Sequence, residues 1–212
     1  MKIAVIGAGN VGGALGTAWA KAGHAIIFGV RDVNKPELKS LCAQIGATAA
    51  PSAEAARQGD VVVLALPWNT AEGAVKSLGD LTGKVVIDTM NPLVMTEGAL
   101  GLDRGFTTSA GETVASWLPA AKVVKTFNQV GANMMTQAHR FETRPVMFLA
   151  GDDDAAKRTV SQLVGEIGFE PLDAGGLEQA RILEPLAMVW INQTVARGFG
   201  RDWAFGVLRP KG

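Results

Sequence analysis

Residues 2–13 read KIAVIGAGNVGG, and this stretch decides the fold class. A short apolar run ends at Gly7, and Gly9 and Gly12 complete the spacing G-x-G-x-x-G. The pattern is informative only between a strand and a helix, and both are expected here. Gly7 allows a tight turn, Gly9 lets the backbone approach a pyrophosphate, and Gly12 lets the helix lie close to the strand. The alternative is a glycine-rich turn in an ordinary α/β protein.

Short apolar runs alternate with helical patterns along the rest of the chain, which is typical of βα units on a parallel sheet. We expect strands over 2–6, 25–30, 61–66, 84–89, 122–127 and 146–150. We expect helices over 11–22, 34–44, 52–58, 71–78, 111–118, 154–167 and 177–197. The predicted fold is α/β, a Rossmann-type doubly wound and mainly parallel sheet with a small C-terminal helical lobe.

After residue 150 the alternation of strands and helices is reduced to one helix, a short strand and a long apolar helix. We therefore divide the chain into a dinucleotide-binding domain (1–150) and a small C-terminal α/β lobe (151–212). The helix expected at 177–197 carries an apolar stripe, which is either internal core or a dimer face. We favour a homodimer, with the substrate site and the dimer face in this lobe. Residues 93–108 have few periodic apolar residues and are expected to form a long loop.

The composition limits the partners and the types of catalysis that are compatible with this chain. Lys+Arg and Asp+Glu both number 20, which argues against nucleic acid as the main partner. The chain has no tyrosine, one cysteine and two histidines. This inventory excludes a tyrosine proton relay, an internal disulfide framework and a cysteine-rich metal site, and we expect no metal. It also leaves few groups for general acid–base catalysis.

The sequence predicts a cytoplasmic protein with no membrane partner. No run of 18 uncharged apolar residues occurs, and the apolar run at the N-terminus is too short for a signal peptide. A single thiol fits the same compartment.

The end of the second expected strand indicates the nicotinamide cofactor. Proteins that bind NAD place a carboxylate there, whereas this chain has Gly29-Val30 followed by Arg31. The planar fork of Arg31 can pair with a 2′-phosphate, and Lys35 adds a second positive charge, so NADP is favoured. In the alternative, Arg31 is a solvated surface residue and Asp32 binds the ribose.

Three later strand ends carry the remaining candidate site residues, because ligands of open parallel sheets bind outside the carboxyl ends of the strands. They are Leu66, Pro67 and Trp68 at the end of the third strand, Asn91 after the fourth, and Asn128 and Gly131 after the fifth. Trp68 could instead pack against a helix, and Asn91 could belong to a plain turn. A small residue such as Gly131 permits either the approach of a flat ring or tight backbone packing.

Several segments carry a resemblance to a known family. They are residues 2–13, 29–31, 66–68, 118–128, 151–154 and 171–175. The chain resembles the NADP oxidoreductases similar to the NADPH-dependent reductase of the 8-hydroxy-5-deazaflavin coenzyme. It also resembles the cytosolic oxidoreductase domain of the STEAP metalloreductases. The VVKTFN segment within 118–128 is more particular than the glycine loop.

The resemblance implies hydride transfer between NADPH and a flavin or deazaflavin ring stacked on the nicotinamide. Matched position by position, the phosphates would be held by Gly9, Asn10, Val11 and Arg31. The ribose and nicotinamide would lie near Pro67, Trp68, Asn91, Asn128 and Gly131. The resemblance does not identify the small-molecule acceptor.

Hydride transfer between stacked rings depends on proximity and orientation, and it requires no protein proton donor. We therefore name no catalytic residue and place the reaction near Pro67, Asn128 and Gly131. Two other functions stay open. One is an imine or 3-hydroxyacid type of reductase, although the residues after 150 are too few for the large helical domain usual there. The other is a non-catalytic NADP sensor.

Overall fold

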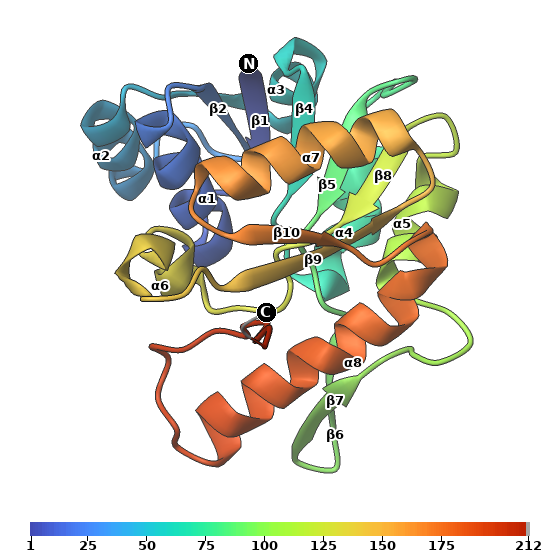
Figure 1. Ribbon diagram of the computed structural model, residues 1–212. Coiled ribbons are helices and arrows are strands. Elements are labelled where there is room, and N and C mark those ends of the chain that lie inside the picture. Colours follow the sequence, from blue (N-terminus) through green and yellow to red (C-terminus); the bar gives the residue numbers. More distant parts are fainter. Residues whose placement is uncertain (211–212) are drawn as a thin grey trace.

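Within residues 1–210, the part of the chain described by the computed structural model, eight strands form one sheet (Figure 1). They are β1 (Lys2–Ile6), β2 (Ala25–Val30), β3 (Thr48–Pro51), β4 (Val61–Leu64), β5 (Val85–Asp88), β8 (Lys122–Lys125), β9 (Val146–Gly151) and β10 (Glu170–Asp173). Their order across the sheet is β10-β9-β8-β5-β4-β1-β2-β3. The six strands from β3 to β8 are parallel, and β9 joins β8 antiparallel. This is the dinucleotide-binding order, so the predicted fold class is confirmed.

Helices cover both faces of the sheet. They are α1 (Asn10–Lys21), α2 (Pro36–Ile45), α3 (Ser52–Gln58), α4 (Trp68–Lys76), α5 (Ala110–Trp117), α6 (Ala132–Met135) and α7 (Asp154–Glu166). The last helix, α8 (Ala180–Ile191), packs against α5. Alternate residues of β1 point to opposite faces: Val5 joins the core under α1, α6 and α7, whereas Ile6 joins the core under α3, α4 and α5. Both faces of the strands are buried, which explains their nearly continuous apolar sequences.

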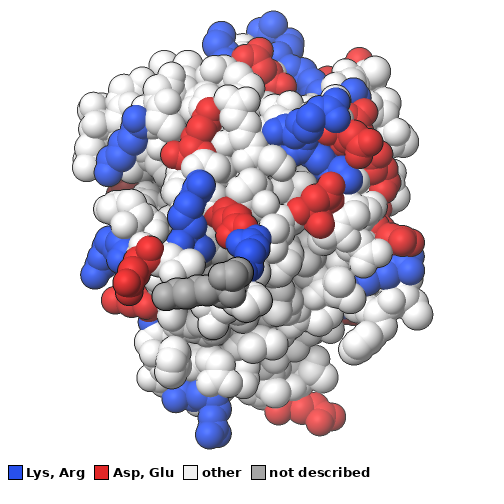
Figure 2. Space-filling model, viewed as in Figure 1, with Lys and Arg blue, Asp and Glu red and all other residues white. Residues whose placement is uncertain are grey.

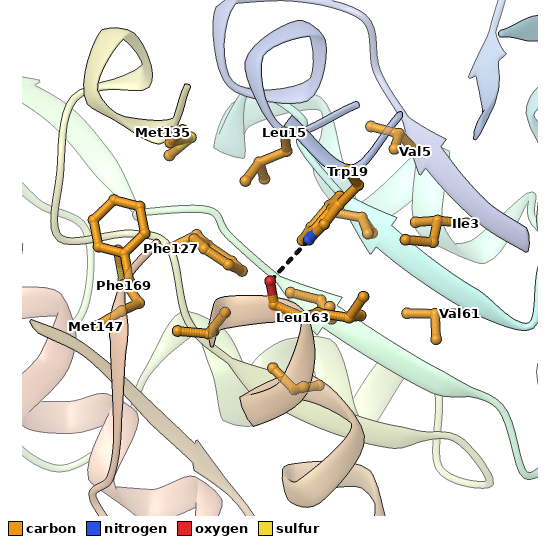
Figure 3. Packing of buried hydrophobic residues seen from close by; sticks show 14 of the residues in the cluster. Ile3, Val5, Leu15, Trp19, Val61, Phe127, Met135, Met147, Leu163 and Phe169 are labelled. Carbon is orange, nitrogen blue, oxygen red and sulfur yellow. Dashed lines mark hydrogen bonds between the residues drawn. The ribbon is translucent and has the colours of Figure 1, made fainter. Parts of the chain in front are cut away.

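The core under α1 joins segments that lie far apart in the sequence (Figure 3). Trp19 of α1 is fully buried, and its Nε1 donates to the Leu163 carbonyl of α7 at 3.0 Å. The ring of Phe127 meets Trp19 edge to face, with centroids 5.6 Å apart. Since α1 begins at the glycine loop, this packing anchors the loop to the body of the protein.

The prediction of a long loop at 93–108 is wrong for its first part. Residues 93–102 form a hairpin of β6 (Leu93–Thr96) and β7 (Ala99–Leu102). Glu97 and Gly98 both have positive φ, +51° and +81°, as a two-residue type I′ turn requires. The hairpin lies on the surface, and Met95 is 64% exposed, so no buried face imposes alternation on the sequence.

The C-terminal part also differs from the prediction in detail. The helix expected at 177–197 consists of a 3₁₀ turn (Leu177–Gln179), α8 and a π-helical turn (Asn192–Ala196). The strand β3 and the short α6 were not predicted. Because β10 pairs with β9, the sheet continues past residue 150, and the division into 1–150 and 151–212 stays a prediction. Among residues 1–210, no helix is both long and apolar enough to span a bilayer.

Candidate functional site

The glycine loop connects β1 to α1, and two of its glycines are required by the packing of the chain itself. Gly7 has φ +102°, and a Cβ there would lie 2.4 Å from the Ala65 carbonyl oxygen. A Cβ on Gly12 would lie 1.9 Å from the carbonyl oxygen of Gly7. Real Cβ atoms do not approach backbone this closely, so both positions exclude any side chain.

Gly9 differs from the other two glycines of the motif, Gly7 and Gly12. A Cβ on Gly9 would meet no atom of residues 1–210 within 4 Å, so their packing does not require glycine there. Gly9 is also the N-cap of α1, and no side chain of the described residues caps the helix. The open space and the uncapped N–H groups at Asn10 and Val11 together fit a phosphate at the N-terminus of the helix.

A cavity of about 860 Å³ opens beside this helix start. Six predicted site residues line it: Gly9, Asn10, Val11, Asn91, Asn128 and Gly131. Further lining comes from α1, α2, α6 and the end of α8. The volume lies within the roughly 300–1,000 Å³ range of small-molecule and cofactor sites. The tertiary structure therefore joins the glycine loop to two strand ends far along the chain.

The side chains of Asn91 and Asn128 form a linked pair at the cavity wall. Asn91 Nδ2 donates to the Asn128 carbonyl at 2.9 Å, and Asn128 Nδ2 donates to Asn91 Oδ1 at 3.1 Å. Asn128 Nδ2 also donates to the Leu183 carbonyl of α8 at 2.9 Å, and Gln129 Nε2 donates to Asn128 Oδ1. These bonds use both Nδ2 hydrogens of Asn128, whereas Asn91 donates only one of its two amide hydrogens within residues 1–210, which leaves the other for a ligand.

Gly131 lines the cavity, and the packing of the chain explains why it is glycine. A Cβ there would lie 2.7 Å from the indole ring of Trp190 in α8. Trp190 Nε1 donates to the Trp203 carbonyl at 3.0 Å, and the two indoles stack with centroids 5.8 Å apart. Of the two explanations of this small residue, the contact with Trp190 supports tight packing.

The residues after β4 do not line the cavity. Leu66 contacts the glycine loop, because its Cδ2 lies 3.4 Å from the position of a Gly7 Cβ. Pro67 is exposed and is the N-cap of α4, so the strand ends earlier than predicted. Trp68 stacks on Trp117 of α5 with centroids 5.5 Å apart, and its Nε1 donates to Asp103 at 3.3 Å.

Arg31 and Lys35 also lie outside the cavity lining, at the end of β2 and the start of α2. Both are exposed. The Gly7 amide donates to the Gly29 carbonyl at 2.9 Å, which places Arg31 two residues from a direct contact with the glycine loop. Asp32, the alternative ribose ligand, accepts the Asn34 amide at 2.9 Å in a local turn.

Three charged residues that the sequence analysis missed form a cluster behind the amide pair. Lys125 Nζ lies 3.0 Å from Asp88 Oδ2 and 2.9 Å from Glu184 Oε1, and all three side chains are 0% exposed. Lys125 Nζ also donates to the Met90 carbonyl. Burial alone disfavours the ammonium form, but the two carboxylates outweigh it and raise the pKa of Lys125 above its ordinary value. We call Asp88, Lys125 and Glu184 the buried charge cluster.

Backbone groups complete the buried charge cluster. Glu184 accepts the Ala110 and Gly111 amides at the start of α5, at 2.9 and 3.0 Å, and Asp88 accepts the Met90 amide at 2.9 Å. The sequence contained one signal for this arrangement: charged residues at the ends of strands that are otherwise apolar. No local pattern shows that α8 supplies the second carboxylate.

Comparison with known proteins identifies relatives of the whole chain. Residues 2–92 match the family model described as NADP oxidoreductase, coenzyme F420-dependent. The chain is 31% identical to the F420-dependent NADP reductase of Methanocaldococcus jannaschii, over 92% of this chain and 93% of that protein. It is 30% identical to the rat metalloreductase STEAP3 over 88% of this chain, but it spans only 36% of that longer protein.

Solved structures agree with these relatives. A crystal structure from Arthrobacter sp. FB24, provisionally described as an F420-dependent NADP reductase, superimposes with a TM-score of 0.90 at 32% identity, over 99% of this chain and 100% of the other. A reductive aminase from Aspergillus terreus, with a TM-score of 0.68 at 17% identity over 93% of this chain and 62% of that one, shares the fold only. The chain belongs to the family of the F420-dependent NADP reductases, which are oxidoreductases.

Proposed function

We propose that this protein binds NADP(H) along the glycine loop and the cavity, and transfers a hydride between it and a flavin or 8-hydroxy-5-deazaflavin acceptor. The observation that carries the proposal is the open space at Gly9, beside an uncapped helix N-terminus and continuous with a large cavity. Family membership supports both the cofactor and the class of acceptor.

Different residues would bind different parts of NADP(H). The N–H groups at Asn10 and Val11 would hold the pyrophosphate, and Asn91 would present its free amide hydrogen to the ribose or nicotinamide. When bound, NADPH supplies the hydride. Among the described residues that line the cavity, Glu37 and Arg201 are the ionisable ones, so the protein contributes chiefly proximity and orientation.

Three of the predicted site residues, Leu66, Pro67 and Trp68, lie outside the cavity lining. Leu66 contacts the glycine loop, and we propose that Leu66 and Pro67 border the nicotinamide because β4 lies next to β1 in the sheet. Trp68 packs against Trp117 within the chain, so we propose that it supports this border from outside the cavity.

Turnover assays test the proposed function directly. Purified protein would be mixed with NADPH and, in turn, FMN, FAD, the deazaflavin coenzyme, and a panel of carbonyls and imines, while NADPH absorbance is followed. We expect oxidation with a ring acceptor and none with the panel. Turnover with carbonyls or imines alone would support the other class of reductase. Tight NADPH binding without any turnover would support a sensor.

Replacing Arg31 with serine tests the choice of cofactor. We expect the Kd for NADPH to rise about 10- to 100-fold, because charge-assisted hydrogen bonds contribute about 1.5–3 kcal/mol. The Kd for NADH should change less than about threefold, since NADH lacks the 2′-phosphate. Titration calorimetry with both cofactors measures the two constants. Arg158→Ser, at an exposed arginine of α7, is the matched control. Equal changes for both cofactors would contradict the assignment.

We also propose that the protein forms a homodimer through the outer face of α8, within the C-terminal lobe 151–212. Ile182 and Val189, seven residues apart on this face, are 59% and 49% exposed. Figure 2 shows few charged side chains over the lower part of the molecule, where α8 lies in Figure 1.

Light scattering after size exclusion should give a mass of twice the 22.1 kDa of one chain. The double variant Ile182→Asp with Val189→Asp should have the mass of a single chain. A monomeric wild type would refute the dimer.

A further inference from the structure

The buried charge cluster carries one more negative than positive charge. Lys125 pairs with both carboxylates, and backbone N–H groups also donate to them: two to Glu184 and one to Asp88. The formal charge of the cluster is therefore −1. The N-terminus of α5, whose amides bind Glu184, offsets part of this charge through its dipole.

Among the described residues, the ion pair that lies between the same two helices, α5 and α8, does not change the net charge. This pair, between Glu112 and Arg181, is balanced in itself, and its side chains are 26% and 36% exposed. All three side chains of the cluster are inaccessible to solvent. Their field is thus screened mainly by protein, which weakens it far less than water does.

The cluster lies directly behind the cavity wall. Lys125 donates to the carbonyl of Met90, the residue before Asn91. Glu184 follows Leu183, whose carbonyl accepts from Asn128. The amide pair that faces the cavity and the cluster behind it are thus built from the same two strand ends and the same turn of α8.

We propose that the net negative charge of the buried charge cluster stabilises the oxidised nicotinamide relative to the reduced one, and so favours hydride donation by NADPH. This inference rests on the proposed function, because it requires NADP(H) in the cavity. Donation removes two electrons and one proton together as a hydride, which passes to the acceptor. The nicotinamide ring gains one positive charge, and the cluster neither gains nor loses a proton or an electron.

The cluster acts through its field and through the amide pair. Its side chains are buried behind Asn91 and Asn128, so they are positioning residues and touch neither cofactor nor acceptor. The negative field favours the oxidised nicotinamide, which carries the additional positive charge, and it does so without direct contact between the cluster and the ring. A purely structural cluster would instead affect the oxidised and the reduced cofactor alike.

Two single substitutions test the proposal by removing one negative charge each. We expect Glu184→Gln and Asp88→Asn each to raise the ratio of Kd for NADP⁺ to Kd for NADPH by about threefold to tenfold. Both constants are measured by calorimetry in the absence of an acceptor, so activity does not enter. Glu112→Gln removes the same kind of charge from the exposed pair between α5 and α8, and should leave the ratio within twofold.

A double substitution separates charge from shape. Lys125→Met combined with Glu184→Gln removes one charge of each sign, leaves the net charge at −1, and should restore the ratio to within about twofold of the wild type. An unchanged ratio in the folded single variants would overturn the proposal, as would a shift in the double variant equal to that in Glu184→Gln. If the wild type binds neither NADP⁺ nor NADPH, the proposed function itself fails, which is a distinct result.

Discussion

Replacing Lys125 with methionine is expected to lower the free energy of unfolding by about 3–5 kcal/mol, because it leaves two carboxylates buried without a cation. Asp88 and Glu184 are both 0% exposed, so water cannot replace the lost partner. Since the folded-state pKa of Lys125 is raised, its contribution is fully present below the unfolded pKa of about 10.4. It is lost only as the pH rises through the higher folded-state pKa.

Urea unfolding at pH 7, followed by circular dichroism, measures this loss. Lys76→Met is the matched control, because Lys76 pairs with Glu72 on the surface and their side chains are 55% and 60% exposed. Such a pair contributes at most about 0.5 kcal/mol. A loss below about 1 kcal/mol at pH 7 would contradict the charge assignment.

The second large effect concerns two glycines of one motif that have different roles. Gly12→Ala is expected to lower the free energy of unfolding by at least about 2 kcal/mol, because its Cβ would lie 1.9 Å from a backbone oxygen of Gly7. Gly9→Ala should leave stability within about 0.5 kcal/mol, since a Cβ there meets nothing within 4 Å and φ is −77°. The same Cβ should raise the Kd for NADPH about tenfold or more, because it occupies the space that a phosphate needs.

Gly12→Ala and Gly9→Ala serve as controls for each other. Thermal unfolding without cofactor reports the packing effect, and calorimetric titration of the folded protein reports the binding effect. Gly13→Ala extends the series, because a Cβ on Gly13 would make only an ordinary contact, 3.6 Å from Leu41 Cδ2. If Gly9→Ala lowered stability as much as Gly12→Ala, glycine at position 9 would be required by the fold rather than by a ligand.

Local chemistry explains why much of the fold was predictable. The strands were predictable because helices bury both of their faces, which makes their sequences nearly continuously apolar. The glycine turn was predictable because no side chain fits at Gly7 or Gly12. Where burial is incomplete, the prediction failed: the hairpin at 93–102 is exposed, and its Glu97-Gly98 turn lacks the asparagine or aspartate that commonly marks such turns.

The candidate site was predictable only in part, for a different reason. Asn91 and Asn128 could be assigned to one edge of the sheet, since the carboxyl ends of parallel strands meet there. Their pairing, however, depends on side-chain directions across 37 residues of sequence. Trp68 and Gly131 illustrate the same limit, because their partners, Trp117 and Trp190, come from helices whose docking no short pattern reveals.

The sequence by itself determined the class of fold, the glycine loop and the absence of tyrosine, because these depend on residue type and short-range spacing. The tertiary structure alone decided which charges meet in the interior. Lys125 and Asp88 come together because β5 and β8 are neighbours, and α8 adds Glu184 from 59 residues beyond Lys125. A buried ion requires its partners at contact distance, and that distance is set by the packing of whole elements.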